Sequence, residues 1–181
     1  DDTVTITGNG YLQNTQVILD FGSVRSLTST TVGNNGRFEL PFSVPSHPRG
    51  LAEMRIRSSN QEIVDQTATF NVKGSLSIVP DNPSVGNTLA INAYAMLPGE
   101  EVKIHVRTDE IEAIADTMGR VQANYVLPEL PNGEVSIELS SVNLLKPLIS
   151  QIKVTPRLKF DKASAAVGEV INVRGTGFNP T

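Results

Sequence analysis

Short runs of alternating apolar and polar residues cover most of the chain. One run places Val17, Leu19 and Phe21 on a single face, and the runs over 38–44 and 52–56 behave in the same way. Alternation with a period of two is typical of antiparallel strands that have one buried and one solvent-facing side. Clusters of Gly, Pro, Asn and Ser separate the runs and supply turns. The strongest helical candidate, Asp109 to Asp116, is short, so the pattern predicts an all-β fold.

The same pattern occurs nearly three times along the chain. The segments 2–11, 87–96 and 169–178 resemble one another at spacings of 85 and then 82 residues, and turn residues such as Gly36 and Gly119 keep a similar spacing. Ordered landmarks at a nearly constant spacing indicate an internal repeat. Repeats of about 80 residues made of short strands predict tandem Ig-like β-sandwiches, antiparallel and of Greek-key type.

The frame of the repeat predicts three parts with short connections. They are a module lacking its first strand at 1–74, a complete module at 75–156, and the opening strands of a third module at 157–181. One interpretation is a piece of a longer array, cut without regard to domain edges. The other is that Arg157 to Thr181 supplies the missing first strand to the next molecule by strand addition. The connections Val72-Lys73-Gly74 and Thr155-Pro156 are short enough to predict a semi-rigid array.

The segment from Val167 to Phe178 combines a Val-Gly turn, a strand and a Gly-x-Gly-aromatic sequence, and Asn35-Gly36-Arg37-Phe38 precedes a strand ending in Pro45. In these features the chain resembles the IPT/TIG-like immunoglobulin-like tandem repeats of prokaryotic cell-surface proteins. The resemblance implies an extracellular location and a role as stalk, S-layer, adhesin or filament building block. The second copy departs at Ala93-Tyr94-Ala95-Met96, which lacks both glycines, so the resemblance implies no identical turn there.

Glycines and apolar residues at repeated positions are expected to be structural. Gly and Asn tolerate a positive φ, which tight turns and hairpins require. The residues expected to serve as structural turns are Gly8, Gly10, Gly36, Gly119, Gly175 and Gly177. Those expected to form the two cores are Val4, Ile6, Phe38, Phe42, Leu89, Ile91, Val121 and Tyr125.

Composition narrows the functional classes. The 181 residues include no Cys and carry a net charge of -4, which excludes thiol chemistry and disfavours a nucleic-acid partner. No apolar run reaches the length of about 20 residues that a membrane span needs. His47 and His105 occupy unrelated positions and no Gly-x-Ser-x-Gly sequence occurs. We therefore expect no enzyme activity, no catalytic residue and no cofactor.

An acidic cluster raises calcium as an alternative to an ordinary hairpin. Asp109, Glu110, Glu112 and Asp116 place four carboxylates within eight residues. Calcium takes six to eight oxygen ligands, yet the spacing matches no EF-hand loop. The corresponding segment of the first copy holds no acid, which favours a solvated hairpin over a metal site.

Two kinds of partner are consistent with the sequence. Arg55 and Glu138 occupy equivalent positions with opposite charge. One interpretation is neutral variation of a solvent-facing surface, and the other is self-association or pairing with neighbouring Ig-like modules. The leading function is a structural repeat segment of an extracellular surface protein, a semi-rigid spacer able to self-assemble. The alternative is an accessory carbohydrate-binding module of a secreted polysaccharide-active protein. Its candidate sugar-stacking residues are Tyr11, Tyr94 and Phe178, which lie at or beside equivalent turns.

Overall fold

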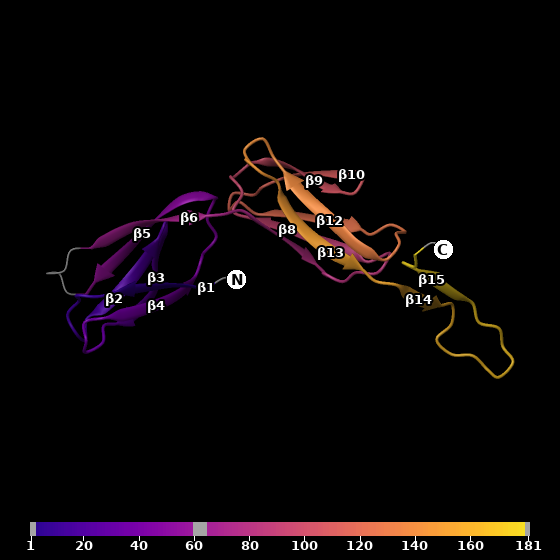
Figure 1. Cartoon of the computed structure of the whole chain (residues 1–181), viewed down its shortest axis with the longest axis horizontal. Helices are drawn as coiled ribbons and strands as arrows, with labels where there is room; N and C mark the ends of the chain where they lie inside the picture. The colour runs from indigo at the N-terminus through magenta and orange to yellow at the C-terminus, as the bar shows by residue number, and fades with distance from the viewer. Residues whose placement is uncertain (1–2, 60–64, 180–181) are drawn as a thin grey trace. The chain divides into compact units, whose positions relative to one another are not determined.

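A computed structural model describes residues 3–59 and 65–179. Every regular element in these residues is a β-strand, and the chain divides into two compact units, Asp1–Lys73 and Gly74–Thr181 (Figure 1). No helix in the described part of the chain is long and apolar enough to span a membrane. The expected all-β fold of antiparallel, Ig-like sandwiches is confirmed.

The first unit is a sandwich of two antiparallel sheets. One sheet pairs β1 with β4, and the other has the order β3-β2-β5-β6. Its strands are β1 (Thr3–Gly8), β2 (Gln16–Phe21), β3 (Val24–Thr31), β4 (Phe38–Ser43), β5 (Gly50–Ser58) and β6 (Gln66–Val72). Alternate residues of β2 and β4 point inward, and the buried set includes Val17, Leu19, Phe21, Leu40 and Phe42. The core of this unit therefore lies between the two sheets, as in other sandwiches.

The second unit contains a sandwich with one more strand, followed by a strand pair. The sandwich sheets have the orders β11-β8-β7 and β10-β9-β12-β13, and β14 pairs with β15. The strands are β7 (Ser75–Val79), β8 (Thr88–Tyr94), β9 (Glu101–Val106), β10 (Asp109–Ile114), β11 (Val121–Val126), β12 (Gly133–Ser140), β13 (Leu148–Val154), β14 (Arg157–Phe160) and β15 (Val173–Thr176). The short segment that held the strongest helical pattern forms strand β10, in which Ile111 and Ala113 alternate with acids.

Strand register repeats along the chain. In the first unit Val4 faces Phe42, and in the second unit the equivalent residues Leu89 and Tyr125 face each other. The pairing of Ser75 with Tyr94 becomes that of Arg157 with Thr176 when 82 is added to each number. Strands β7 and β14 are therefore equivalent first strands. The first unit contains no counterpart of β7 in its described residues.

Two residues expected in the core of the first unit, Val4 and Ile6, are less buried than their equivalents in the second unit. Leu89 and Ile91 on β8 are fully buried, whereas their equivalents Val4 and Ile6 on β1 are only half-buried. Strand β7 pairs with β8 and covers it, and no described strand lies beside β1 in the same way. Of the remaining expected core residues, Phe38, Phe42 and Val121 are buried, and Tyr125 at the end of a strand is half-buried.

The turn that follows β1, β8 and β15 keeps a residue of positive φ at the same position in all three copies. Gly10 has a φ of 80°, Gly177 has a φ of 73°, and Ala95 at the equivalent position has a φ of 60°. The second copy therefore retains the left-handed turn although it lost the glycine. Tertiary context overrides the preference of alanine at this position.

Candidate functional site

An open groove runs along the side of the first unit. It lies between β1, at the edge of the two-stranded sheet, and β6, at the edge of the four-stranded sheet. Its volume is about 490 Å³, and Ile6, Phe38, Met54 and Ile56 contribute apolar surface to it. A groove of this kind is an accessible part of the core rather than a separate depression.

In the second unit, strand β7 and its apolar side chains fill the place equivalent to the groove. There β7 pairs with β8 and also packs beside β13, so one strand bridges the two sheets. On β7, Ile78 is buried and Leu76 is half-buried against the core. The positions equivalent to Ile6 and Met54 are Ile91 and Ile137, and both are fully buried. The groove therefore occupies the place that β7 takes in the second unit.

The two strands beside the groove carry little protection against pairing. β1 reads TVTITG and β6 reads QTATFNV, so neither contains a charged residue or a proline. By contrast, edge strand β10 carries three acids, and edge strand β3 carries Arg25. Charges and prolines are the usual means by which exposed sheet edges avoid pairing with another strand. The strands beside the groove therefore lack the two residue kinds that usually protect an edge.

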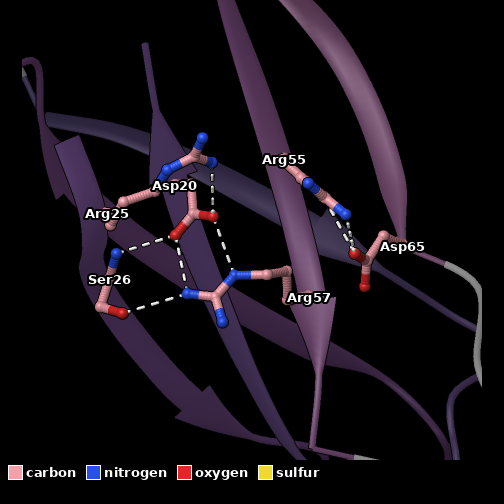
Figure 2. A network of polar contacts seen from close by, with 6 residues as sticks. All are labelled: Asp20, Arg25, Ser26, Arg55, Arg57 and Asp65. Atoms are coloured by element: carbon pink, nitrogen blue, oxygen red, sulfur yellow. Dashed lines mark hydrogen bonds and ion pairs between the residues drawn. The ribbon is translucent and has the colours of Figure 1, made fainter. Parts of the chain in front are cut away.

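A second feature of the first unit is a buried carboxylate on the outer face of the four-stranded sheet. The Asp20 side chain is 3% exposed and lies where the β2–β3 register shifts. Arg57 donates two hydrogen bonds to it, each of 2.8 Å, and Arg25 donates a third of 3.2 Å (Figure 2). The backbone N–H of Ser26 donates a fourth. The hydrogen bonds from Arg57 hold the pKa of Asp20 well below its usual range, and this outweighs the opposing effect of burial.

The chemistry open to this cluster is structural. Both carboxylate oxygens of Asp20 accept hydrogen bonds from within the unit, and Arg55 is held by Asp65 through an Nε–Oδ2 bond of 2.9 Å (Figure 2). Arg55, the residue predicted from sequence to pair with another module, thus has a partner inside its own unit. The cluster fastens β2, β3 and β5 together. Sequence reasoning missed Asp20, although an acid in a buried strand opposite two arginines on the neighbouring strand was a usable signal.

The four acids of the calcium alternative lie along one hairpin without converging. Glu110 binds Lys103 at 2.7 Å, and Glu112 lies 3.6 Å from the same ammonium group. Asp116 accepts hydrogen bonds of 2.8 and 2.9 Å from two backbone N–H groups of its own turn. Asp109 belongs to the same hairpin, and within the described residues no three His, Asp or Glu side chains are grouped to hold a metal ion. Asp109, Glu110 and Glu112 thus lie on the β9–β10 hairpin, and Asp116 caps the turn that follows it.

The three aromatic residues considered for sugar stacking belong to two different units. Tyr11 is half-buried in the first unit, where its ring meets the edge of Phe38 at a centroid distance of 5.1 Å. Tyr94 and Phe178 belong to the second unit and are 42% and 54% exposed. The Phe178 ring lies so close over Gly175 that a Cβ there would approach it to 2.7 Å. Tyr11 and Phe178 therefore pack against residues of their own turns.

The six turn glycines divide into two physical classes. Gly10, Gly36, Gly119 and Gly177 have φ values between 71° and 80°, in the region that favours glycine. Gly8 and Gly175 instead lie beneath aromatic rings, and a Cβ on Gly8 would approach the Phe38 ring to 2.2 Å.

Comparisons with known proteins add little to this geometry. No family model matches the sequence, and neither does any curated protein. Among solved structures, the BSP domain of a biofilm-associated protein is 19% identical with a TM-score of 0.31, covering 90% of this chain and 28% of that one. An ICAM-5 D1–D4 ectodomain fragment is 12% identical with a TM-score of 0.32, covering 96% of this chain and 56% of that one. The chain thus spans only part of each, and TM-scores this low carry no argument about function.

Proposed function

We propose that the chain is a structural repeat segment of an extracellular surface protein, in which Ig-like sandwiches act as semi-rigid spacers and perform no catalysis. The observation that carries the proposal is the repetition of strand register from copy to copy, with only two residues between β6 and β7 and two between β13 and β14. Repeated units joined this closely have a stability and a spacing that add along the array.

The connection between β13 and β14 supports a stiff junction. The backbone N–H and the hydroxyl of Thr155 both donate to the carbonyl of Pro83, and the Thr155 hydroxyl lies 3.1 Å from that of Ser84. On the other side, a Cβ on Gly177 would come within 3.0 Å of the Thr155 carbonyl oxygen. Glu129 of the sandwich also accepts a hydrogen bond from Arg174 of β15. Contacts on both sides restrict the motion of this linker.

The spacer role is tested by measuring how narrowly the junction holds its distance. Because the chain has no Cys, spin labels placed at Ser136→Cys and Val167→Cys report without background. We expect a narrow distribution of label distances, which broadens when Gly-Ser-Gly-Ser is inserted between Thr155 and Pro156. The same insertion after the fully exposed Leu145 is the matched control and should leave the width unchanged. A broad distribution in the uninterrupted chain would contradict the proposal.

The extracellular location needs a separate test. Protease treatment of intact cells of the source organism should release peptides of this chain that mass spectrometry detects. Release only after lysis would contradict a surface location without bearing on the stiffness of the junction.

A further inference from the structure

We propose that the outer face of the three-stranded sheet in the second unit binds a neutral carbohydrate chain. Tyr94 stacks on one sugar ring. The side-chain amides of Asn92, Gln122 and Asn124 bind hydroxyl groups of the neighbouring sugars. This goes beyond the spacer role, because it assigns a binding site and the chemistry of its ligand.

The three strands of this sheet carry no charged residue. β7 reads SLSIV, β8 reads TLAINAY and β11 reads VQANYV. The strands of the opposite sheet, β9, β10, β12 and β13, each carry at least one charged residue. An uncharged face has no partner for an ionic ligand, whose loss of hydration would go uncompensated. The face is therefore suited to a neutral ligand.

A row of polar side chains crosses all three strands. Asn92 on the central strand β8 lies opposite Ser77 of β7 and opposite Gln122 of β11. The buried residues of β8 alternate with Asn92, so the row lies on the outer face. In the next row, Asn124 lies opposite Ala90.

The amides of these rows retain unused hydrogen-bonding groups. Gln122 Nε2 lies 3.5 Å from Asn92 Oδ1, which is a long hydrogen bond. No other side-chain hydrogen bond of Asn92, Gln122 or Asn124 occurs among the described residues. Gln122 and Asn124 are exposed, and Asn92 is half-buried. An amide both donates and accepts hydrogen bonds, as a sugar hydroxyl does, so each of the three can bind a sugar.

Tyr94 provides an aromatic ring at one end of the same face. It is the last residue of β8, lies two residues from Asn92, and is 42% exposed. The residue opposite it is Ser75, which is small. Two residues along a strand span about 7 Å, and adjacent strands lie about 4.8 Å apart. These steps are close to the length of one pyranose unit, so a sugar stacked on Tyr94 places the next one over the amides.

Affinity electrophoresis tests for binding with four neutral polysaccharides that differ in sugar and linkage: dextran, laminarin, galactomannan and hydroxyethylcellulose. We expect at least one of them, cast into the gel, to slow the migration of the whole chain, whereas anionic polygalacturonate does not. Retardation by none of the four neutral polymers would overturn the proposal, and so would equal retardation by polygalacturonate.

Substitutions of aromatic residues locate the stacking site. Tyr94→Ala should weaken binding of the retarding polysaccharide at least about tenfold, and Tyr94→Phe, which keeps the ring, should bind nearly as well as the unmodified chain. Phe178→Ala is the matched control, since Phe178 is also exposed but follows β15 and lies off this sheet. Its binding should be unchanged.

Substitutions of glutamine distinguish the two sheets of the sandwich. Gln122→Ala should weaken binding about threefold, because it removes one amide from the face. Gln151→Ala removes the same exposed side chain from β13 on the opposite sheet and should have no effect. Binding that neither Tyr94→Ala nor Gln122→Ala weakens would place the ligand elsewhere and overturn the proposal.

Side-chain amide signals in proton–nitrogen NMR spectra report the contact directly. Short oligosaccharides of the retarding polymer should shift the signals of Asn92, Gln122 and Asn124 and leave that of Gln151 in place. If the same signals shifted with rising protein concentration in the absence of sugar, the face would bind a second copy of the chain instead. Neither result bears on the spacer role, because the label distances across the junction do not involve this sheet.

Discussion

The two sandwiches share a plan of strand pairing but fill it with different side chains. In the first unit Phe21, Phe38 and Phe42 are buried, and the Phe21 ring lies 5.9 Å from that of Phe42. The equivalents of Phe21 and Phe38 in the second unit are Val106 and Val121. The first core therefore relies on rings where the second relies on aliphatic side chains and an additional strand. One register accommodates both, since a core tolerates substitutions that keep volume and pattern.

The outer faces differ as much as the cores. Asp20 in the first unit is enclosed by Arg57 and Arg25, whereas its equivalent, His105, lies 3.5 Å from Glu110 on a more acidic sheet. The pattern of inward residues is thus preserved between copies, whereas the charges of the outward residues differ from one copy to the other. Inward positions are constrained by shared geometry, while each outward face needs only to satisfy its own charges.

The largest effect is expected from emptying the aromatic core. Phe42→Ala should lower the free energy of unfolding of the first unit by about 3–5 kcal/mol, because it leaves a cavity in the middle of the ring cluster. The equivalent substitution Tyr125→Ala should cost the second unit less, since that side chain is half-buried. Hydrogen exchange detected by mass spectrometry at increasing denaturant concentration measures the free energy of unfolding of each unit separately.

Val126→Ala is the matched control, because Val126 neighbours Tyr125 on the same strand and is 61% exposed. Its effect should be within about 0.5 kcal/mol of zero. Equal losses from Phe42→Ala and Tyr125→Ala would show that the two cores do not differ in the way described.

The core positions were predictable and their degree of burial was not. Alternation in the sequence identifies the inward face of a strand, and it did so correctly for Phe38, Leu89 and Val121. Whether such a residue is covered depends on the strand beside it. In the described residues, β1 pairs with β4 alone, whereas β8 pairs with both β11 and β7. The half-burial of Val4 and Ile6 follows from that fact, which a pattern confined to one strand does not contain.

The stability of the two units should also depend differently on pH below about pH 4. Asp20 has a pKa below its usual range when folded, so it binds a proton more weakly in the folded than in the unfolded state. Its contribution to stability is therefore present above pH 4 or so and is lost as the pH falls toward the folded-state pKa. We expect the first unit to lose stability below pH 4 more steeply than the second, measured by denaturation at a series of pH values.

Substitutions can distinguish the contribution of Asp20 to stability from that of the other acidic residues. Asp20→Asn should flatten the acid dependence of the first unit. Arg57→Ala should cost it about 3 kcal/mol at neutral pH, because a buried charge then loses its main partner. Lys103→Ala removes an exposed pair on the second unit and should cost less than about 1 kcal/mol. An acid profile unaffected by Asp20→Asn would place the pH dependence elsewhere.

The ionic partners of Asp20 and Arg55 could not be predicted from the internal repeat. Comparing copies identified Arg55 as a residue whose charge is inverted at Glu138, and that pointed outward to another module. The structure instead pairs Arg55 with Asp65 and buries Asp20 under Arg57. Which side chains meet across two strands depends on how the strands are aligned and on the shift of register in β2. The sequence of one strand contains neither the alignment nor the shift.

The smallest expected effect concerns the turn that one copy makes without glycine. Ala95 adopts a φ of 60°, where an L-residue with a Cβ is strained, and Gly10 makes the same turn at 80°. Gly10→Ala should destabilise the first unit by about 1 kcal/mol. A Cβ at that position meets nothing within 4 Å, so the cost is purely conformational.

The reciprocal change, Ala95→Gly, should stabilise the second unit by about 0.5 kcal/mol, because relief of strain exceeds the added freedom of the unfolded chain. Ala113→Gly in strand β10 is the control and should destabilise by about as much, since glycine weakens an extended strand. Thermal unfolding of the three variants is the measurement. Destabilisation of the second unit by Ala95→Gly would show that packing of the Ala95 Cβ holds the turn. The positive φ of Gly10 and that of Ala95 would then have different physical causes.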